Sequence, residues 1–332
     1  MSNPAAFLKH EDQLRTVSTL KDHFGTGHFY TLDYQSDYRL DDMLKANVTN
    51  NDEFQAALQR ILIADRLPKP SMGAGCTAFM VKDRRGHVLV GRNYDFRHEP
   101  ATLLIKTSPE GENRSMGMCD LAFIDIKPGQ LSDGRSDISS VMMFPYLTLD
   151  GLNDKGVCIS VLQLRNATTN QDTGKGKVVT TLAIRAVLDR AGSVQEAMEI
   201  FSSYDMQSAL PGNDYHFLLA DKKGDSAVIE YVDNKMNVIS TDRVTNFFLS
   251  KGSRRRGAGK ERYDVVDAVM RYHEGIMERK EVMETLKLVS QPSPLKKTGG
   301  SRTLWSAVYD LTAGELDLAI DRKYGRILHF SL

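Results

Sequence analysis

The chain is poor in cysteine, with three residues of this type, Cys76, Cys119 and Cys158, among 332. The count is odd and no two cysteines stand close together, so the pattern fits neither a disulfide framework nor a zinc site. This usage is typical of proteins in a reducing compartment. The N-terminus also lacks a basic stretch followed by an apolar one, so no signal peptide is predicted. We therefore expect a cytoplasmic protein.

Long apolar runs and an excess of one charge are also lacking. No stretch approaches the ~20 apolar residues that span a bilayer, so no membrane partner is expected. Lys+Arg and Asp+Glu balance at 43 each, which leaves no global field to attract nucleic acid. No glycine-rich phosphate loop precedes a helix, and no cofactor or metal is predicted. The composition, 41% hydrophobic and 26% charged, is that of a globular protein with a sizeable core.

Residues 1–75 differ from the rest of the chain because their apolar residues recur mainly at helical spacing. In residues 51–62, four apolar side chains fall on one face of a helix. The segment ends at residues 67–75 (LPKPSMGAG), where two prolines and two glycines stop a helix and predict an accessible loop. We predict a mainly helical unit over residues 1–75.

From residue 76 onward the pattern changes to strands joined by short turns. Residues 76–82 and 87–92 flank an Arg-Arg-Gly turn and predict a hairpin. Further strands are expected at residues 101–107, 116–126, 140–149, 157–162, 215–220, 226–232, 235–240, 244–249, 303–310, 315–320 and 326–331. Helices are expected at residues 177–191, 193–204, 263–273 and 280–289. Strand blocks that alternate with helix pairs predict an α+β domain of two antiparallel sheets, each covered by two helices.

One cysteine, Cys76, stands where the flexible residues 73–75 meet the first of these strands. A cation and a carboxylate, Arg92 and Asp95, follow within residues 91–96 (GRNYDF). By itself Cys76 fits a small buried hydrophobe, which is what most free cysteines are. A cation near a cysteine stabilises its nucleophilic thiolate, so the alternative is a nucleophile served by these two charged residues.

Four motifs together resemble the choloylglycine hydrolase and isopenicillin N acyltransferase group of N-terminal nucleophile hydrolases, which includes bile salt hydrolases and penicillin V acylases. The motifs are GCT at residues 75–77, GRNYDF at 91–96, DGLNDKGV at 150–157 and WSAVYD at 305–310. Arg92 and Asp95 follow Cys76 by sixteen and nineteen residues, the spacings of that group. The resemblance covers residues 76–332 and implies a four-layer αββα sandwich with amidase chemistry.

The resemblance also implies that the chain cuts itself. In such families the free α-amino group of the nucleophile serves as the base, but Cys76 is internal. The implied route is attack of the Cys76 thiol on the Gly75 carbonyl, followed by hydrolysis of the thioester. Gly75 has no side chain to obstruct this attack. Residues 1–75 would then be a propeptide that covers the site until cleavage, and residues 76–332 the catalytic domain.

The family roles can be carried over to individual residues. Arg92 would stabilise the Cys76 thiolate, and Asp95 would bind and orient the new α-ammonium group. Asn246 would donate a hydrogen bond to the oxyanion of the tetrahedral intermediate.

Two further assignments are less direct. Gln163 stands where bile salt hydrolases carry a second asparagine, so its backbone N–H would serve as a donor even if the longer side chain is displaced. Arg262 matches the late arginine that steadies the site, with Arg254, Arg255 or Arg256 as alternative counterparts. The same three arginines, taken as a run, are also typical of a solvated loop.

Other candidates fit structural roles better. His98, His216 and His329 lie in or beside apolar strand patterns, which favours core or surface positions over a Cys–His pair. Cys119 has no matched partner, and Cys158 lies in a strand that looks buried.

The sequence therefore predicts a self-processing cysteine amidase that hydrolyses the linear, non-peptide C–N bond of a small-molecule acyl amide through an acyl thioester. One alternative is an acyltransferase, in which an amine takes the acyl group in place of water. Another is an unprocessed binding protein that has kept the fold. The identity of the substrate and self-association into homo-oligomers stay open.

Overall fold

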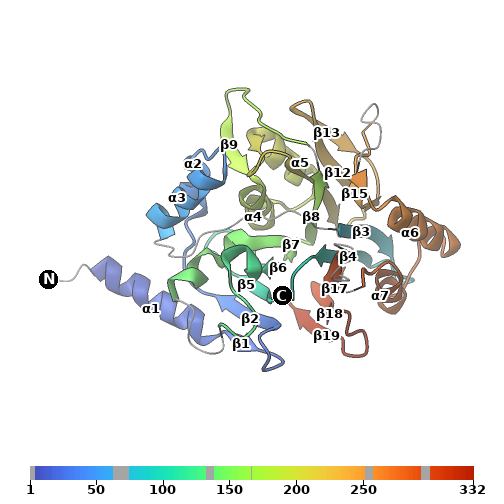
Figure 1. Ribbon diagram of the computed structural model, residues 1–332, viewed down its shortest axis with the longest axis horizontal. Coiled ribbons are helices and arrows are strands. Elements are labelled where there is room, and N and C mark those ends of the chain that lie inside the picture. The colour runs from blue at the N-terminus through green and yellow to red at the C-terminus, as the bar shows by residue number, and fades with distance from the viewer. Residues whose placement is uncertain (1–3, 63–74, 132–137, 166, 251–256, 293–299) are drawn as a thin grey trace.

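Two β-sheets occupy the centre of the molecule, and helices lie on their outer sides (Figure 1). The computed structural model describes residues 4–62, 75–131, 138–165, 167–250, 257–292 and 300–332. The two sheets contact each other where β3 of one meets β8 and β11 of the other. This arrangement confirms the predicted α+β fold with two main sheets.

The larger sheet has nine strands in the order β1-β2-β5-β6-β7-β8-β11-β12-β13. Its neighbours are antiparallel except β2 and β5, which run parallel. The strands are β1 (Lys21–Asp22), β2 (Phe29–Tyr34), β5 (Thr102–Thr107), β6 (Ser115–Asp120), β7 (Thr148–Asn153), β8 (Val157–Arg165), β11 (Asn213–Asp221), β12 (Ser226–Val232) and β13 (Lys235–Ile239).

The smaller sheet has six antiparallel strands in the order β14-β3-β4-β17-β18-β19. They are β14 (Arg243–Val244), β3 (Gly75–Lys82), β4 (Val88–Phe96), β17 (Arg302–Asp310), β18 (Glu315–Ile320) and β19 (Leu328–Ser331). Two short pairs complete the strands: β9 (Gly176–Val179) with β10 (Tyr204–Gln207), and β15 (Asn246–Phe247) with β16 (Gly257–Ala258).

Helix pairs cover the sheets as predicted. Helices α4 and α5 pack on the nine-stranded sheet, and α6 and α7 pack on the six-stranded sheet. The helices are α1 (Pro4–Ser18), α2 (Leu40–Lys45), α3 (Asn51–Leu62), α4 (Thr180–Arg190), α5 (Val194–Ser203), α6 (Lys260–Tyr272) and α7 (Arg279–Leu288), with 3-10 helices η1 (Leu121–Ile124) and η2 (Ile138–Leu147). Within the ranges that the structure describes, no helix has the length and apolar character needed to cross a membrane.

Successive side chains of β3 lie on opposite sides of the six-stranded sheet and pack into two different cores. Cys76 and Ala78 belong to the core between the two sheets. Phe79 and Val81 belong to a second core beneath α6 and α7, with Val282 among its members. Because successive side chains of a strand point to opposite faces, Cys76 faces the interior between the sheets.

One predicted strand is wrong. Residues 140–149 form most of the buried 3-10 helix η2, and the strand β7 begins at Thr148. Pro145 lies inside η2 and cannot donate to a sheet ladder. A short buried apolar run does not distinguish a strand from a helix by its period, which explains the error. The strand predicted over residues 116–126 likewise ends at Asp120, whose side chain caps η1.

The N-terminal residues are not a separate helical propeptide. They contain α1, α2 and α3, but β1 and β2 form one edge of the nine-stranded sheet. Phe29 is paired with Thr102 at the start of the parallel β2–β5 ladder. The buried Tyr38 hydroxyl donates to Asp189 Oδ2 of α4 at 2.7 Å. The described part of residues 1–75 is therefore integrated into the fold around residues 76–332.

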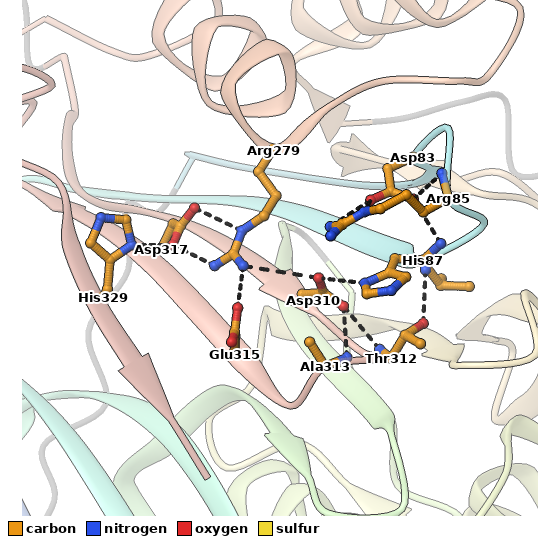
Figure 2. Close-up of polar contacts among 11 residues, drawn as sticks. Asp83, Arg85, His87, Arg279, Asp310, Thr312, Ala313, Glu315, Asp317 and His329 are labelled. Carbon is orange, nitrogen blue, oxygen red and sulfur yellow. Dashed lines mark hydrogen bonds and ion pairs between the residues drawn. The ribbon is translucent and has the colours of Figure 1, made fainter.

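A polar cluster ties α7 to the turn between β17 and β18. Figure 2 shows Arg279, the first residue of α7, among three carboxylates. Its guanidinium donates to both oxygens of Asp317, donates to Glu315, and lies 3.9 Å from Asp310 Oδ2. His87 Nδ1 is 3.0 Å from the same Asp310 oxygen, which links the β3–β4 turn to the cluster. The Arg279 guanidinium thus offsets the charge of several carboxylates and joins α7 to β17 and β18 of the smaller sheet.

Replacing Arg279 by alanine should destabilise the protein by roughly 1–3 kcal/mol, because the clustered carboxylates lose their shared cation. The matched control is Arg271→Ala on α6, where an exposed arginine pairs with Asp267 and the loss should stay below ~1 kcal/mol. Urea unfolding at low and high salt measures both variants. Equal midpoints for Arg279→Ala and the parent chain would show that the cluster does not stabilise the fold.

Candidate active site

Cys76 lies one residue inside β3 and is almost completely buried. It lines a cavity whose walls come from both sheets and from α3 and α4. The walls are mainly apolar and aromatic, and among the described residues none that lines the cavity carries a charge. The lining residues include Phe54, Tyr94, Phe96, Phe123, Tyr146 and Val161, with Asn51, Gln163, Thr180, Thr181 and Tyr215 as polar members. The cavity can hold an apolar group directly against the Cys76 thiol.

Arg92 brings a fixed cation to the thiol. It lies on β4 opposite Ala78, and by alternation its side chain shares the inner face with Cys76. The buried guanidinium donates from Nε to Asp150 Oδ2 at 3.1 Å and from Nη2 to the Val161 carbonyl at 2.7 Å. Burial by itself would lower the pKa of Arg92, but the Cys76 thiolate and the Asp150 carboxylate raise it. The arrangement suits the predicted role of stabilising negative charge on sulfur.

Asp150 is a buried counter-ion that the sequence analysis missed. Besides Arg92, it accepts hydrogen bonds from Trp305 Nε1 at 3.2 Å and from the Tyr309 hydroxyl. Burial raises the pKa of Asp150, and Arg92 opposes this shift. The sequence places Asp150 in a run dense in turn residues, whereas β7 extends to Asn153. An aspartate that follows an apolar run could have indicated a buried carboxylate in need of a cationic partner.

Asp95 lies on β4 opposite Gly75, on the side of the sheet that faces α6. Its Oδ1 accepts from Thr303 Oγ1 at 2.6 Å. Its Oδ2 has no hydrogen-bond partner among the described residues and is 3.8 Å from Arg262 Nη1. A Cβ placed on Gly75 would lie 3.3 Å from this oxygen and 3.3 Å from Ser301 Oγ. The structure thus sets a carboxylate oxygen without a hydrogen bond directly beside the Gly75–Cys76 bond.

Burial raises the pKa of Asp95 to about 6, with Arg262 acting in the opposite direction. A charged carboxylate pays a desolvation penalty here that its neighbours only partly offset.

Asn246 begins β15 and holds the backbone of Cys76. Its Oδ1 accepts from the Cys76 amide and from Arg262 Nη2, the latter at 3.0 Å. Its Nδ2 donates to the Gln163 carbonyl at 2.9 Å. Asn246 therefore reaches the candidate site, while its role as oxyanion donor stays a prediction.

Arg262 reaches the site from the first turn of α6. Its Nη1 donates to the Cys76 carbonyl and, at 3.0 Å, to Thr77 Oγ1. Gly259 precedes the helix with a φ of 82°, and a Cβ at that position would overlap the Arg262 guanidinium. A glycine is therefore required where the helix start presses against the arginine. The alternative counterparts Arg254, Arg255 and Arg256 lie outside the described residues.

Gln163 comes to the site from β8, and its carbonyl accepts the Asn246 hydrogen bond. Its Nε2 donates to Asn213 Oδ1, and Asn213 Nδ2 donates to the Tyr215 hydroxyl at 2.9 Å. Gln163 and Tyr215 are partners in the β8–β11 ladder, and both line the cavity. Neither Asn213 nor Tyr215 belongs to a recognised motif, so the sequence alone does not single them out.

The three histidines considered from the sequence have other partners. His98 Nε2 is 2.9 Å from Asp120 Oδ2. The buried His216 has Nε2 2.6 Å from the Thr245 carbonyl. His329 pairs with Asp317 in the partly buried cluster of Figure 2. These contacts agree with structural roles.

The other two thiols are buried in apolar surroundings. Burial raises the pKa of Cys119 to about 12, and it also raises the pKa of Cys158. Both thiols remain protonated at neutral pH, which sets them apart from a reactive cysteine.

Comparison with known proteins identifies the class of enzyme to which the chain belongs. The model of the linear amide C–N hydrolases of the choloylglycine hydrolase family matches residues 76–246. The chain belongs to this family and is a hydrolase of linear amide C–N bonds. A search of the curated proteins finds no match.

Solved structures show the same fold at low sequence identity. An arginine-to-leucine variant of conjugated bile acid hydrolase from Clostridium perfringens is 17% identical, with a TM-score of 0.59 over 77% of this chain and 92% of that one. A cysteine-to-alanine mutant of the same hydrolase is 16% identical, with a TM-score of 0.58 over the same shares of the two chains. Penicillin V acylase from Agrobacterium tumefaciens is 17% identical, with a TM-score of 0.51 over 74% of this chain and 83% of that one.

The raised pKa of Asp95 predicts a pH-dependent cost to stability. The folded chain holds this proton up to about pH 6, whereas the ordinary value is 3.8. The cost therefore grows as the pH rises from about 4 to 6 and is complete above that window. In a chain that carries Cys76→Ala, Asp95→Asn should raise the free energy of unfolding by roughly 1–3 kcal/mol at pH 8 and by little near pH 4.

Thermal unfolding across this pH range measures the effect. The control is Asp264→Asn, which changes an exposed carboxylate on α6. If Asp95→Asn raised the free energy of unfolding equally at all pH values, or lowered it at pH 8, the desolvation cost assigned to Asp95 would be contradicted.

Proposed function

We propose that this hydrolase uses Cys76 as its nucleophile and creates the N-terminal amine of Cys76 by cutting its own Gly75–Cys76 bond. The observation that carries the proposal is the buried Asp95 oxygen beside that bond, which has no hydrogen-bond partner in the described ranges of the chain. An α-ammonium group released by the cut would supply a hydrogen-bond donor to this oxygen and a second cation beside Arg262. The two sheets with their helix pairs would then act as the αββα sandwich of N-terminal nucleophile hydrolases.

The cut needs a thiol that can reach the carbonyl carbon immediately before it. The Cys76 sulfur adds to the Gly75 carbonyl carbon, the C–N bond breaks, and the Cys76 nitrogen takes up the proton. Water then hydrolyses the thioester and leaves a Gly75 carboxylate and a free thiol. Asn246 and Arg262 hold the two polar backbone groups of Cys76 and so keep the amide in place during the attack.

The amidase reaction repeats this chemistry on an external acyl amide. The free amine of Cys76 accepts the thiol proton, since an α-amino group titrates near pH 8. Arg92 stabilises the thiolate, which attacks the acyl carbon and forms a tetrahedral intermediate. The amine product leaves with the proton, and water hydrolyses the acyl thioester. Asp95 keeps the α-amine oriented toward the sulfur in both halves of the cycle.

We further propose that residues 1–75 stay bound after the cut. Strand β2 is paired with β5 inside the larger sheet, and Tyr38 is hydrogen-bonded to Asp189 of α4. Asn51 and Phe54 of α3 line the Cys76 cavity. Removing this segment would expose apolar core and open the cavity, so it acts as a retained part of the enzyme.

The cavity favours an uncharged, apolar acyl group. Its described lining is mainly aromatic and aliphatic, without a charged side chain to pair with an ionic substrate. The similar solved structures are named as a conjugated bile acid hydrolase and a penicillin V acylase, and conjugated bile acids and penicillin V are likewise small acyl amides. We propose a small-molecule amide of an apolar acyl group as the substrate class.

Intact mass of the purified protein tests self-cleavage. The parent chain should appear as two pieces that separate between Gly75 and Cys76 and elute together from a sizing column. Cys76→Ala should remain one chain of 37.1 kDa, because no thiol can attack the carbonyl. Cys119→Ala is the matched control, since it removes another buried thiol and should be cut normally. A parent chain that stays whole and hydrolyses no acyl amide would refute the proposal.

Truncating Phe54 tests the contribution of α3 to the acyl site. Phe54→Ala removes a wall of the cavity, so kcat/KM for hexanoyl p-nitroanilide should fall about tenfold while that for dodecanoyl p-nitroanilide holds or rises. The control is Gln59→Ala on the exposed side of α3, which should change neither value. Parallel losses for both substrates would mean that Phe54 supports the fold and does not select the acyl group.

A further inference from the structure

Tyr215 lines the cavity of Cys76 from the larger sheet. It lies on β11, which contacts β3, and both residues line the same cavity. Burial raises the pKa of Tyr215 most, and the charges of Asp214 and, to a smaller extent, Cys76 raise it further. That pKa is about 12, so the hydroxyl keeps its proton at neutral pH.

Hydrogen bonds fix the direction of this hydroxyl. Asn213 Nδ2 donates to the Tyr215 oxygen at 2.9 Å, and Gln163 Nε2 in turn donates to Asn213 Oδ1. The Tyr215 oxygen is therefore used as an acceptor, while its own hydrogen has no acceptor within the part of the chain that the structure describes. A phenol can accept and donate at the same time, so the O–H remains available to a ligand.

The other tyrosines that line the cavity already donate their hydroxyl hydrogens to protein acceptors. Tyr94 donates its O–H to Asp120 Oδ2 at 3.2 Å, and Tyr146 donates to the Tyr38 carbonyl at 2.6 Å. Of the described tyrosines that line the cavity, Tyr215 alone has its hydroxyl hydrogen uncommitted.

The side-chain amides of Gln163 and Asn246 near Cys76 each donate one of their hydrogens to another protein group. The Gln163 side chain, which stands at the expected second donor position, gives a hydrogen to Asn213. Asn246 Nδ2 gives one to the Gln163 carbonyl. A tetrahedral intermediate needs donors aimed at its oxygen, and a further donor from another strand would meet this need.

We propose that Tyr215 is a catalytic residue whose O–H donates a hydrogen bond to the oxyanion formed when Cys76 attacks an acyl amide. This assignment rests on the function proposed above. As the C–S bond forms, the π electrons of the acyl carbonyl move to its oxygen, which accepts the Tyr215 hydrogen bond. When the intermediate collapses, the carbonyl reforms, the C–N bond breaks and the amine leaves with the proton held by the Cys76 amine. Tyr215 keeps its proton throughout and acts only by hydrogen bonding.

Tyr215→Phe tests the proposal, because it keeps the ring and removes the donor. With hexanoyl p-nitroanilide as the probe, kcat should fall ~10²–10³-fold, the typical effect of losing one oxyanion donor, while KM changes less than threefold. Hexanal, which forms a tetrahedral adduct with a thiol, should bind correspondingly more weakly. Alkylation of Cys76 by iodoacetamide should be unchanged, since it creates no oxyanion on an acyl carbon.

A second variant keeps the tyrosine and redirects its hydrogen. In Asn213→Asp the new carboxylate has no N–H to donate, so the Tyr215 O–H should turn to it and leave the cavity. The kcat should fall by a similar factor, and the double variant should lose little more, because both changes remove one interaction. Tyr231→Phe on β12 is the control, since that hydroxyl has no hydrogen-bond partner among the described residues and lies outside the cavity.

The outcomes separate this assignment from the general mechanism. If the parent chain is cut and active and Tyr215→Phe keeps kcat within threefold, the assignment of Tyr215 falls while the proposed function stands. If the rate of Cys76 alkylation and the thermal stability fall together with kcat, Tyr215 has a structural role and the assignment also falls. An uncut and inert parent chain would overturn both proposals.

Discussion

The buried ion pair between Arg92 and Asp150 is the interaction on which the rest of the site depends. Both side chains are fully removed from solvent, and they join β4 of one sheet to β7 of the other. Arg92 also binds the Val161 carbonyl of β8, while Trp305 and Tyr309 satisfy Asp150. Such a pair adds little net stability compared with apolar packing, but loss of one partner costs about 3–5 kcal/mol. Its evident use is to hold a cation against Cys76 between two sheets.

A second constraint is the desolvation of the Asp95 carboxylate, which Arg262 only partly offsets. Asp95 is buried near the end of β4, and one of its oxygens has no hydrogen-bond partner among the described residues. Its raised pKa reflects the desolvation cost. Gly75 fits beside it because a larger residue would crowd Asp95 and Ser301. The N-terminal residues complete the surroundings, since β2 extends the larger sheet and Phe54 lines the cavity. The chain before Cys76 is thus built into the structure that would use the new amine.

Much of the central hairpin could be predicted from the sequence. Cys76, Arg92 and Asp95 lie within twenty residues on two adjacent antiparallel strands, so spacing and alternation largely decide their mutual placement. The helix pairs over each sheet were also predictable from their apolar period. The strand predicted at 140–149 was wrong because buried 3-10 helix and buried strand have similar composition. The propeptide prediction failed to recognise β2, whose partner β5 lies about seventy residues later.

The sequence by itself determined the family motifs, the α+β class and the residues that accompany Cys76 along one hairpin, because these depend on local period and short-range pairing. Tertiary structure alone decided that Asp150 is the counter-ion of Arg92 and that Tyr215 faces the same cavity as Cys76. It also decided that α3 closes that cavity. These contacts join segments from different sheets and from distant parts of the chain, and no local pattern in a single sequence specifies which of many buried polar groups will meet. Packing of the two sheets makes that choice.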